Sequence, residues 1–131
     1  MPIKVVDLKE MADAPNPKRT VLINGPRFHA WFHPYLKPGQ RDEMHCHNAD
    51  QTFYCIEGEC TMHFPDGTQQ VLHPGMAALI TGGSFYQLEN SGSGPMIMMG
   101  NRSGPAEKIQ IIDYVTRKDI RQQAPAEVSD S

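Results

Sequence analysis

Two histidines separated by a single residue are the strongest candidates for chemistry in this sequence. His45 and His47 flank Cys46, and alternate residues of an extended strand project to the same face, about 7 Å apart along the backbone. Two imidazoles placed in this way can bind one cation together. Gln51 follows after three residues, a connection short enough for a hairpin. The hairpin would bring an amide oxygen to the same point as the two imidazoles.

Glycines at fixed distances frame these residues. Five residues separate Gly39 from His45, and six separate Gln51 from Gly58. The segment resembles the first motif of the cupin superfamily, in which Gly and five residues lead to His-x-His, three residues lead to Glu, and six more lead to Gly. Every spacing agrees with that pattern. One residue differs, because Gln51 stands where the family pattern has Glu.

A second segment, beginning at Gly75, is similar to the second cupin motif. Five residues separate Gly75 from Thr81, which is followed by Gly83, Tyr86 and Asn90 at the spacings of the motif. Thr81 stands in place of Pro, and Tyr86 stands in place of the fourth metal-binding His. The resemblance covers about residues 28–100 and implies a cupin fold.

The resemblance implies a divalent transition metal held at the positions of His45, His47, Gln51 and Tyr86. Replacing Glu by Gln removes the one negative charge of the family's ligand set, and a Tyr86 phenolate would restore it, since a nearby dication lowers the phenol pKa from about 10. Alternatively, Tyr86 stays protonated and acts as a general acid or base beside a metal held by the other three side chains and water. Imidazole and oxygen ligands suit Fe(II), Mn(II), Ni(II) and Zn(II) alike.

A cupin barrel that has lost its metal is the competing interpretation. In that case His45 and His47 form hydrogen bonds with Gln51 and Tyr86 instead of binding a cation. Two neutral imidazoles and an amide make a weak metal site, which gives this interpretation weight. Both interpretations place the four side chains together, so the sequence alone does not separate them.

Composition and charge restrict the class of protein. The chain has 131 residues and a net charge of -3, with no cluster of Lys or Arg, so we expect neither nucleic acid nor a membrane surface as a partner. No apolar run approaches the roughly 18 residues of a membrane-spanning helix, and the N-terminus lacks the pattern of a signal peptide. Three cysteines cannot all pair, which favours reduced thiols and a cytoplasmic protein.

The expected elements form an all-β, single-domain cupin jelly-roll barrel of about ten strands. Short apolar runs lie between eleven glycines and eleven prolines, which is typical of many strands joined by turns. The apolar, β-branched run at residues 3–8 predicts an edge strand there. Residues 28–36 carry aromatic or apolar side chains on both faces, so one face should line the barrel and the other should meet a second layer or a partner subunit. We expect N-terminal strands and a connection over 1–27, the conserved barrel over 28–115, and a polar tail over 116–131.

These observations predict a metal-dependent enzyme that acts on a small oxygenated metabolite inside the barrel. Cupins include lyases, isomerases and dioxygenases, and the fold does not choose among them. Some bacterial cupin lyases are similar in having Gln at the position of Gln51, which favours lyase chemistry slightly. The alternative is a non-catalytic sensor or ligand-binding barrel. Cupins commonly pair, and the apolar edge strand and the two-sided aromatic strand predict a homodimer.

Overall fold

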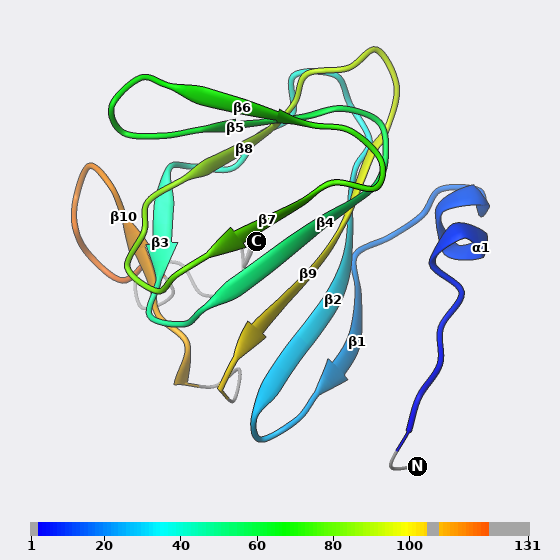
Figure 1. Ribbon diagram of the computed structural model, residues 1–131, viewed down its shortest axis with the longest axis horizontal. Coiled ribbons are helices and arrows are strands. Elements are labelled where there is room, and N and C mark those ends of the chain that lie inside the picture. Colours follow the sequence, from blue (N-terminus) through cyan, green and yellow to red (C-terminus); the bar gives the residue numbers. More distant parts are fainter. Residues whose placement is uncertain (1–2, 105–107, 121–131) are drawn as a thin grey trace.

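The computed structural model describes residues 3–104 and 108–120, which form ten strands and a short helix (Figure 1). The all-β prediction of about ten strands is confirmed. The elements are α1 (Leu8–Asp13), β1 (Thr20–Asn24), β2 (Phe28–Tyr35), β3 (His45–His47), β4 (Gln51–Glu57), β5 (Cys60–His63), β6 (Gln69–Leu72), β7 (Ala77–Ile80), β8 (Gln87–Asn90), β9 (Met96–Ser103) and β10 (Ile111–Asp113).

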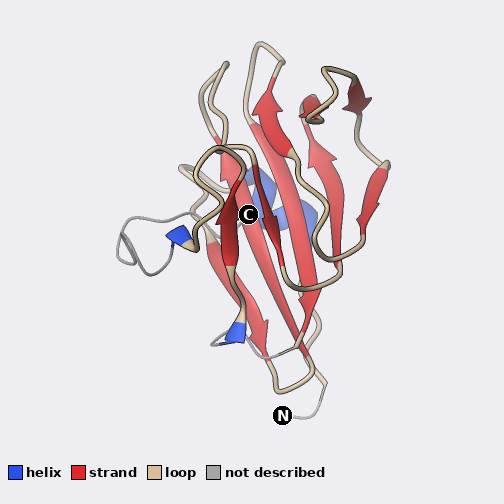
Figure 2. Ribbon diagram, turned by 90° about the vertical axis from the view of Figure 1, so that its left-hand side faces the viewer, coloured by secondary structure: helices blue, strands red, loops and turns tan. Residues whose placement is uncertain are grey.

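The strands form three antiparallel sheets around one interior. Five strands pair in the order β1-β2-β9-β4-β7, three in the order β6-β5-β8, and β10 pairs with β3. Viewed from the side, the strands run along one long direction and the loops gather at its two ends (Figure 2). Strands far apart in sequence therefore become neighbours, as β2 and β9 do along eight paired positions.

Strand β2 shows why the sheets enclose a core. Trp31 and Tyr35 point inward and are almost completely buried, while Ala30 and Phe32 point to the outer face. The inward side chains join a cluster between the five-stranded and three-stranded sheets that includes Phe53, Cys55, Cys60, Met62, Leu72, Tyr86, Leu88, Met96 and Met98. Helix α1 packs on part of the outer face, so a second layer expected for this strand comes from the same chain.

The expected edge strand at residues 3–8 is wrong. Residues 3–7 form no strand, and helix α1 begins at Leu8. Asp7 caps the helix, since its Oδ1 accepts a hydrogen bond from the backbone N–H of Glu10 at 3.0 Å. Leu8, Met11 and Ala12 have the three- and four-residue spacing of one helix face, and all three pack on the outer sheet. Capping and helical spacing therefore outweigh the β-branched residues that precede them.

Two glycines of the cupin-like motifs lie in turns whose backbone conformation would be strained for any other residue. Gly58 has a φ of 83°, and a Cβ there would lie 2.2 Å from the carbonyl oxygen of Pro95. Gly83 has a φ of 85°, and its N–H donates to the carbonyl oxygen of His47 at 2.8 Å. Both positions favour glycine, because residues with a Cβ rarely adopt positive φ.

The described residues contain no helix with the length and apolar character needed to cross a membrane. The predicted C-terminal tail at 116–131 lies outside the described residues from 121 onward.

Candidate functional site

Strand β3 places both histidines in the interior. His45, Cys46 and His47 make up the strand, all three are buried, and their backbone pairs with β10. On its other side, His45 exchanges two backbone hydrogen bonds with Tyr86, with N···O distances of 3.0 and 2.9 Å. This pairing sets Tyr86 beside His45, with their ring centroids 4.9 Å apart.

The four side chains selected from the sequence meet in one buried group. His45 Nε2 lies 3.1 Å from His47 Nε2. Gln51, the first residue of β4, donates from Nε2 to the hydroxyl oxygen of Tyr86 at 2.9 Å. Each of the four residues is between 1% and 4% exposed. The structure thus brings together the four residues that strand parity and motif spacing selected, and their chemical roles stay proposals.

Hydrogen-bond partners define which nitrogen of each histidine carries the proton. Arg102 Nη1 lies 3.2 Å from His47 Nδ1. Because a guanidinium only donates, His47 Nδ1 accepts and neutral His47 carries its proton on Nε2. His45 Nδ1 lies against the backbone carbonyl oxygen of Glu43, which only accepts, so His45 carries its proton on Nδ1. His47 Nε2 therefore donates to His45 Nε2.

Three features of this group fit a divalent metal ion. Two nitrogen ligands about 2.1 Å from a metal and at a right angle are about 3.0 Å apart, close to the 3.1 Å between the Nε2 atoms of His45 and His47. Gln51 Oε1 is buried and has no hydrogen-bond partner in the described part of the chain. His45 Nδ1 faces a carbonyl oxygen, as the second nitrogen of metal-binding histidines usually does.

Two features oppose a metal without excluding it. Binding through His47 Nε2 would displace the proton that the contact with Arg102 holds there. No group of three or more His, Cys, Asp or Glu that could hold a metal occurs among residues 3–104 and 108–120. A dication would therefore rest on neutral ligands beside a guanidinium, which raises the cost of burying its charge. His45, His47 and Gln51 fit the ion, and Arg102 weakens that fit.

Tyr86 is held in its protonated form. Burial raises the pKa of Tyr86 well above its ordinary value, and the hydrogen bond from Gln51 offsets only part of that rise. In this state Tyr86 is a neutral phenol whose oxygen accepts from Gln51 and whose O–H group can donate. Conversion to a phenolate would need a cation close to the oxygen.

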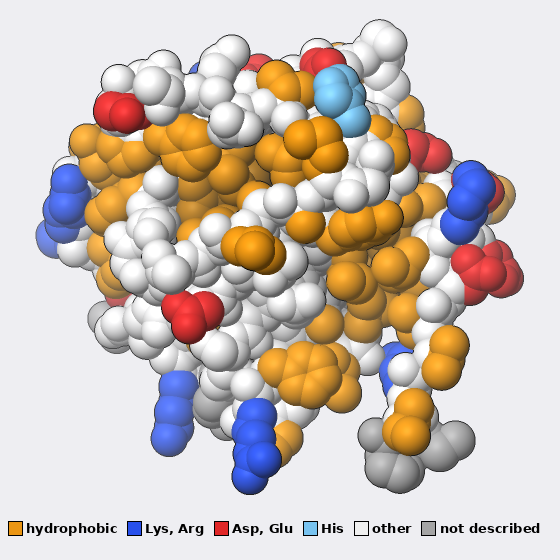
Figure 3. Space-filling model, viewed as in Figure 1, with side chains coloured by type: hydrophobic (Ala, Val, Ile, Leu, Met, Phe, Trp, Pro, Cys, Tyr) orange, Lys and Arg blue, Asp and Glu red, His pale blue; other side chains and the backbone are white. Residues whose placement is uncertain are grey.

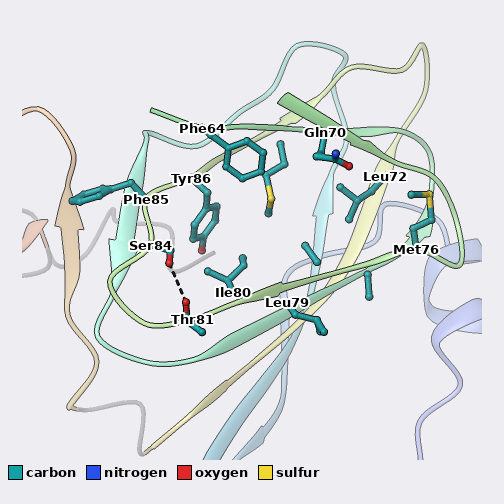
Figure 4. Close-up of a pocket in the computed structure, with 13 residues that line it drawn as sticks. Phe64, Gln70, Leu72, Met76, Leu79, Ile80, Thr81, Ser84, Phe85 and Tyr86 are labelled. Atoms are coloured by element: carbon teal, nitrogen blue, oxygen red, sulfur yellow. Dashed lines mark hydrogen bonds between the residues drawn. The ribbon is translucent and has the colours of Figure 1, made fainter. Parts of the chain in front are cut away.

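Tyr86 also forms part of the wall of an apolar cavity of about 340 Å³ (Figure 4). The cavity is lined from both sheets by Met62, Phe64, Gln70, Leu72, Met76, Ala77, Ala78, Leu79, Ile80, Thr81, Ser84, Phe85 and Tyr86. The two histidines and Gln51 do not line it. Tyr86 is therefore the residue shared by the cavity and the buried polar group.

Arg102 was not selected from the sequence, although the alternation of strand residues indicates that its side chain points into the interior. Met96, Met98 and Gly100 of β9 share its parity, and all four positions are buried. The guanidinium stacks over the Trp31 ring at 4.4 Å from the ring centroid. Extending the period of two beyond the apolar run at Met96 would have placed this charge inside the barrel.

The three cysteines contribute to the packing of the core. Cys46, Cys55 and Cys60 are buried free thiols. Burial raises the pKa of Cys55 to about 11 and that of Cys60 to about 12, so neither thiol is a ready nucleophile near neutral pH.

Comparison with known proteins agrees with this architecture. Residues 33–99 match the family described as a cupin domain. Among solved structures, an uncharacterised double-stranded β-helix protein from Klebsiella pneumoniae has a TM-score of 0.68 at 21% identity, covering 83% of this chain and 96% of that one. A protein from Thermus thermophilus has a TM-score of 0.65 at 25% identity, with 78% and 98% covered. An RmlC-like cupin from Shewanella frigidimarina has a TM-score of 0.61 at 21% identity, with 68% and 77% covered. No curated protein matches the sequence.

Proposed function

This chain belongs to the cupin family, and we propose that it is a metal-dependent enzyme acting on a small oxygenated metabolite inside the barrel. The observation that carries the proposal is the buried histidine pair, whose Nε2 atoms lie 3.1 Å apart. Gln51 belongs to the same buried group through Tyr86, and its Oε1 has no hydrogen-bond partner among the described residues.

Each residue of the site has a distinct task in this proposal. Glu43 orients His45 through its carbonyl oxygen, and Tyr86 orients Gln51 by accepting from its amide nitrogen. A bound dication would supply Lewis acidity toward a carbonyl or hydroxyl oxygen of the substrate. Tyr86, the fourth candidate ligand, is placed for proton transfer rather than ligation, because its oxygen already accepts from Gln51 and its side chain also borders the cavity.

Proton transfer favours lyase or isomerase chemistry over dioxygenase chemistry. Lyases and isomerases move protons to and from carbon or oxygen, and a buried phenol at the cavity wall can serve as that acid or base. The three buried free thiols suit a reducing compartment, so we place the protein in the cytoplasm.

A ligand-binding or sensor barrel without metal is the second candidate. It is favoured by the contact between Arg102 and His47 Nδ1, which satisfies the two histidines through a chain of hydrogen bonds in the absence of any metal. In this alternative His45 and His47 are structural, and only the cavity binds a small molecule.

Metal analysis separates the two candidates. Tag-free protein is incubated with Fe(II), Mn(II), Ni(II) or Zn(II), dialysed, and measured by plasma mass spectrometry. We expect about one ion per chain for at least one metal, and loss of most of it in His47→Ala. His63→Ala is the matched control, because His63 lies on β5 and contacts Glu89 at 2.6 Å. Wild-type protein that retains none of the four metals would contradict the enzyme proposal and favour the ligand-binding barrel.

A further inference from the structure

We propose that the cavity beside Tyr86 binds a monocyclic aromatic molecule that is uncharged and carries one oxygen directed at the Tyr86 hydroxyl. The use of this molecule as a substrate rests on the proposed function, whereas its binding does not. Four properties of the cavity carry the inference: its opening, its uncharged lining, its size and the position of Tyr86 in its wall.

The cavity lies between the unpaired edges of two sheets. The five-stranded sheet ends at β7 and the three-stranded sheet ends at β6, and both strands contribute to the lining. No strand pairs across these two edges among the described residues. Figure 3, which has the same view as Figure 1, shows hydrophobic side chains in the hollow between the two sheets. Met76 and Leu79, which are 44% and 80% exposed, lie at this open side.

The lining excludes charged ligands. None of the thirteen side chains around the cavity is charged. A phosphate or carboxylate inside it would lose its water without gaining a cation, at a cost of several kcal/mol. Thr81 and Ser84 lie 3.2 Å apart through their hydroxyl oxygens, so these two polar groups can satisfy each other (Figure 4). The interior therefore favours an uncharged molecule that is mostly apolar.

Side-chain type favours an aromatic ring, and the volume limits the ligand to a small molecule such as a single substituted ring. A volume of about 340 Å³ is near the lower end of the range for small-molecule sites, which excludes large cofactors. Phe64 and Phe85 line the cavity together with Met62 and Met76. Phenylalanine rings pack favourably against other aromatic rings, and the thioether sulfur of methionine also makes favourable contacts with aromatic rings.

Tyr86 supplies the polar end of the site. Its oxygen accepts from Gln51 Nε2 at 2.9 Å, and its O–H group has no acceptor among the described residues. Figure 4 shows its hydroxyl directed toward the five-stranded sheet, on which Gln51 lies. An uncharged oxygen on the ligand could accept this hydrogen bond. The ligand would then meet the one residue that the cavity shares with the proposed metal site.

Methionine-methyl NMR tests the inference on the unmodified protein. The probe is p-cresol at pH 7, and benzoate is its charged counterpart of similar size. We expect saturable shifts of the methyl signals of Met62 and Met76, which line the cavity, and none for Met11 and Met99, which pack on the outer face. We also expect benzoate to bind at least tenfold more weakly. No shift at millimolar p-cresol, shifts confined to Met11 and Met99, or equal binding of benzoate would each overturn the inference.

A cavity-filling variant gives a second test. In Ala78→Trp the indole would occupy the lined space, and we expect at least a tenfold weaker affinity for p-cresol by calorimetry. Val115→Trp introduces the same side chain at a residue that is 86% exposed and outside the lining, and it should leave binding unchanged. A folded Ala78→Trp protein with unchanged affinity would contradict the site.

Both tests are run on chelator-treated protein and on His47→Ala. Ligand binding in the cavity can then be refuted independently of metal binding at the histidine pair. Binding of p-cresol without any metal uptake supports the cavity and removes the enzyme proposal. Metal uptake without p-cresol binding supports the metal site and overturns the proposed ligand of the cavity.

Discussion

At the residue scale, two of the four ligand positions of the cupin pattern carry other residues here, and these two residues contact each other. Gln51 stands where the pattern has Glu and Tyr86 where it has His, and the amide of Gln51 donates to the Tyr86 hydroxyl at 2.9 Å. The Gln and the protonated Tyr keep this contact uncharged. A neutral amide that donates to a neutral phenol leaves no unpaired charge in the interior, so the two departures are chemically consistent with each other.

Tyr86→Phe tests what the hydroxyl does. The change removes the oxygen and keeps the ring that packs in the core, so the fold should persist. If Tyr86 acts as a general acid or base, metal content stays at the wild-type level and turnover falls about 100- to 10,000-fold. We expect this outcome, measured by metal analysis and steady-state kinetics.

A phenolate ligand would behave differently under the same change. The Fe(III) form would show a visible charge-transfer band that Tyr86→Phe abolishes together with part of the metal. Leu88→Met is a matched core control, because Leu88 is fully buried near the same cluster but carries no polar group. A Tyr86→Phe protein with normal metal and normal turnover would reduce Tyr86 to a packing residue.

His33 makes folding stability depend on pH. Burial, reinforced by the charge of Arg19, lowers the pKa of His33 to about 3, and its Nδ1 accepts a hydrogen bond from Trp31. Between pH 6.5 and 3 the unfolded chain takes up the proton that folded His33 refuses, so stability is complete above pH 6.5 and falls as pH decreases. We expect a loss of about 2 kcal/mol from this group between pH 7 and 5.

Urea unfolding of the wild type and His33→Gln at both pH values isolates this contribution. Gln keeps an acceptor for the Trp31 N–H without titrating. The variant should lose less stability than the wild type on acidification, and equal losses in the two proteins would rule out the assignment.

At the scale of elements, β9 connects the fold to the site. It pairs with β2 and with β4, and its buried face runs from Met96 to Arg102. Gly100 allows the Trp31 ring to lie directly against the strand, since a Cβ there would be 2.6 Å from Trp31 Cζ2. Trp31 in turn stacks under Arg102. Packing between β2 and β9 thus positions the guanidinium that contacts His47.

Gly100→Ala should therefore destabilise the protein. The Trp31 ring is fully buried and must shift to make room for the methyl group, at an overpacking cost of about 1–3 kcal/mol. Chemical denaturation measures the change in the free energy of unfolding. Gly94→Ala is the control, because no atom lies within 4 Å of its added Cβ and its φ is not positive. Equal stabilities of the two variants would refute this packing argument.

Prediction from sequence succeeded where one local rule decided the structure. Strand parity and motif spacing brought His45, His47, Gln51 and Tyr86 together, because a short strand and a hairpin leave little freedom of register. It failed at residues 3–8, where capping by Asp7 and packing of α1 on the outer sheet outweighed strand propensity. It missed Arg102, because the inward position of a charge depends on its partners across the barrel.

At the scale of the whole molecule, the outer face of the five-stranded sheet is only partly covered. Helix α1 packs over part of it, while Phe28 remains 48% exposed and Ile3 remains 73% exposed. Ile3, Val6 and Phe28 line one shallow depression on this face. Two sequence arguments for a homodimer are therefore weakened, because residues 3–8 form no edge strand and α1 supplies a second layer over β2. The exposed patch of Ile3 and Phe28 is what still favours a dimer.

We predict a homodimer that buries this patch. Phe28→Asp should shift the mass from dimer to monomer, because an unpaired carboxylate would lie in the interface. Light scattering at micromolar concentration measures the mass directly. Val115→Asp adds the same charge in the loop after β10 and should leave a dimer intact. A wild-type monomer mass would contradict the prediction.

X-ray absorption spectroscopy of the reconstituted protein tests the metal centre most directly. We predict nitrogen or oxygen ligands at about 2.0–2.2 Å together with the outer-shell scattering of two imidazole rings, from His45 and His47. In His47→Ala, any metal that remains should show a single imidazole ring. A wild-type spectrum without imidazole scattering, or one that His47→Ala leaves unchanged, would contradict a metal site at the histidine pair.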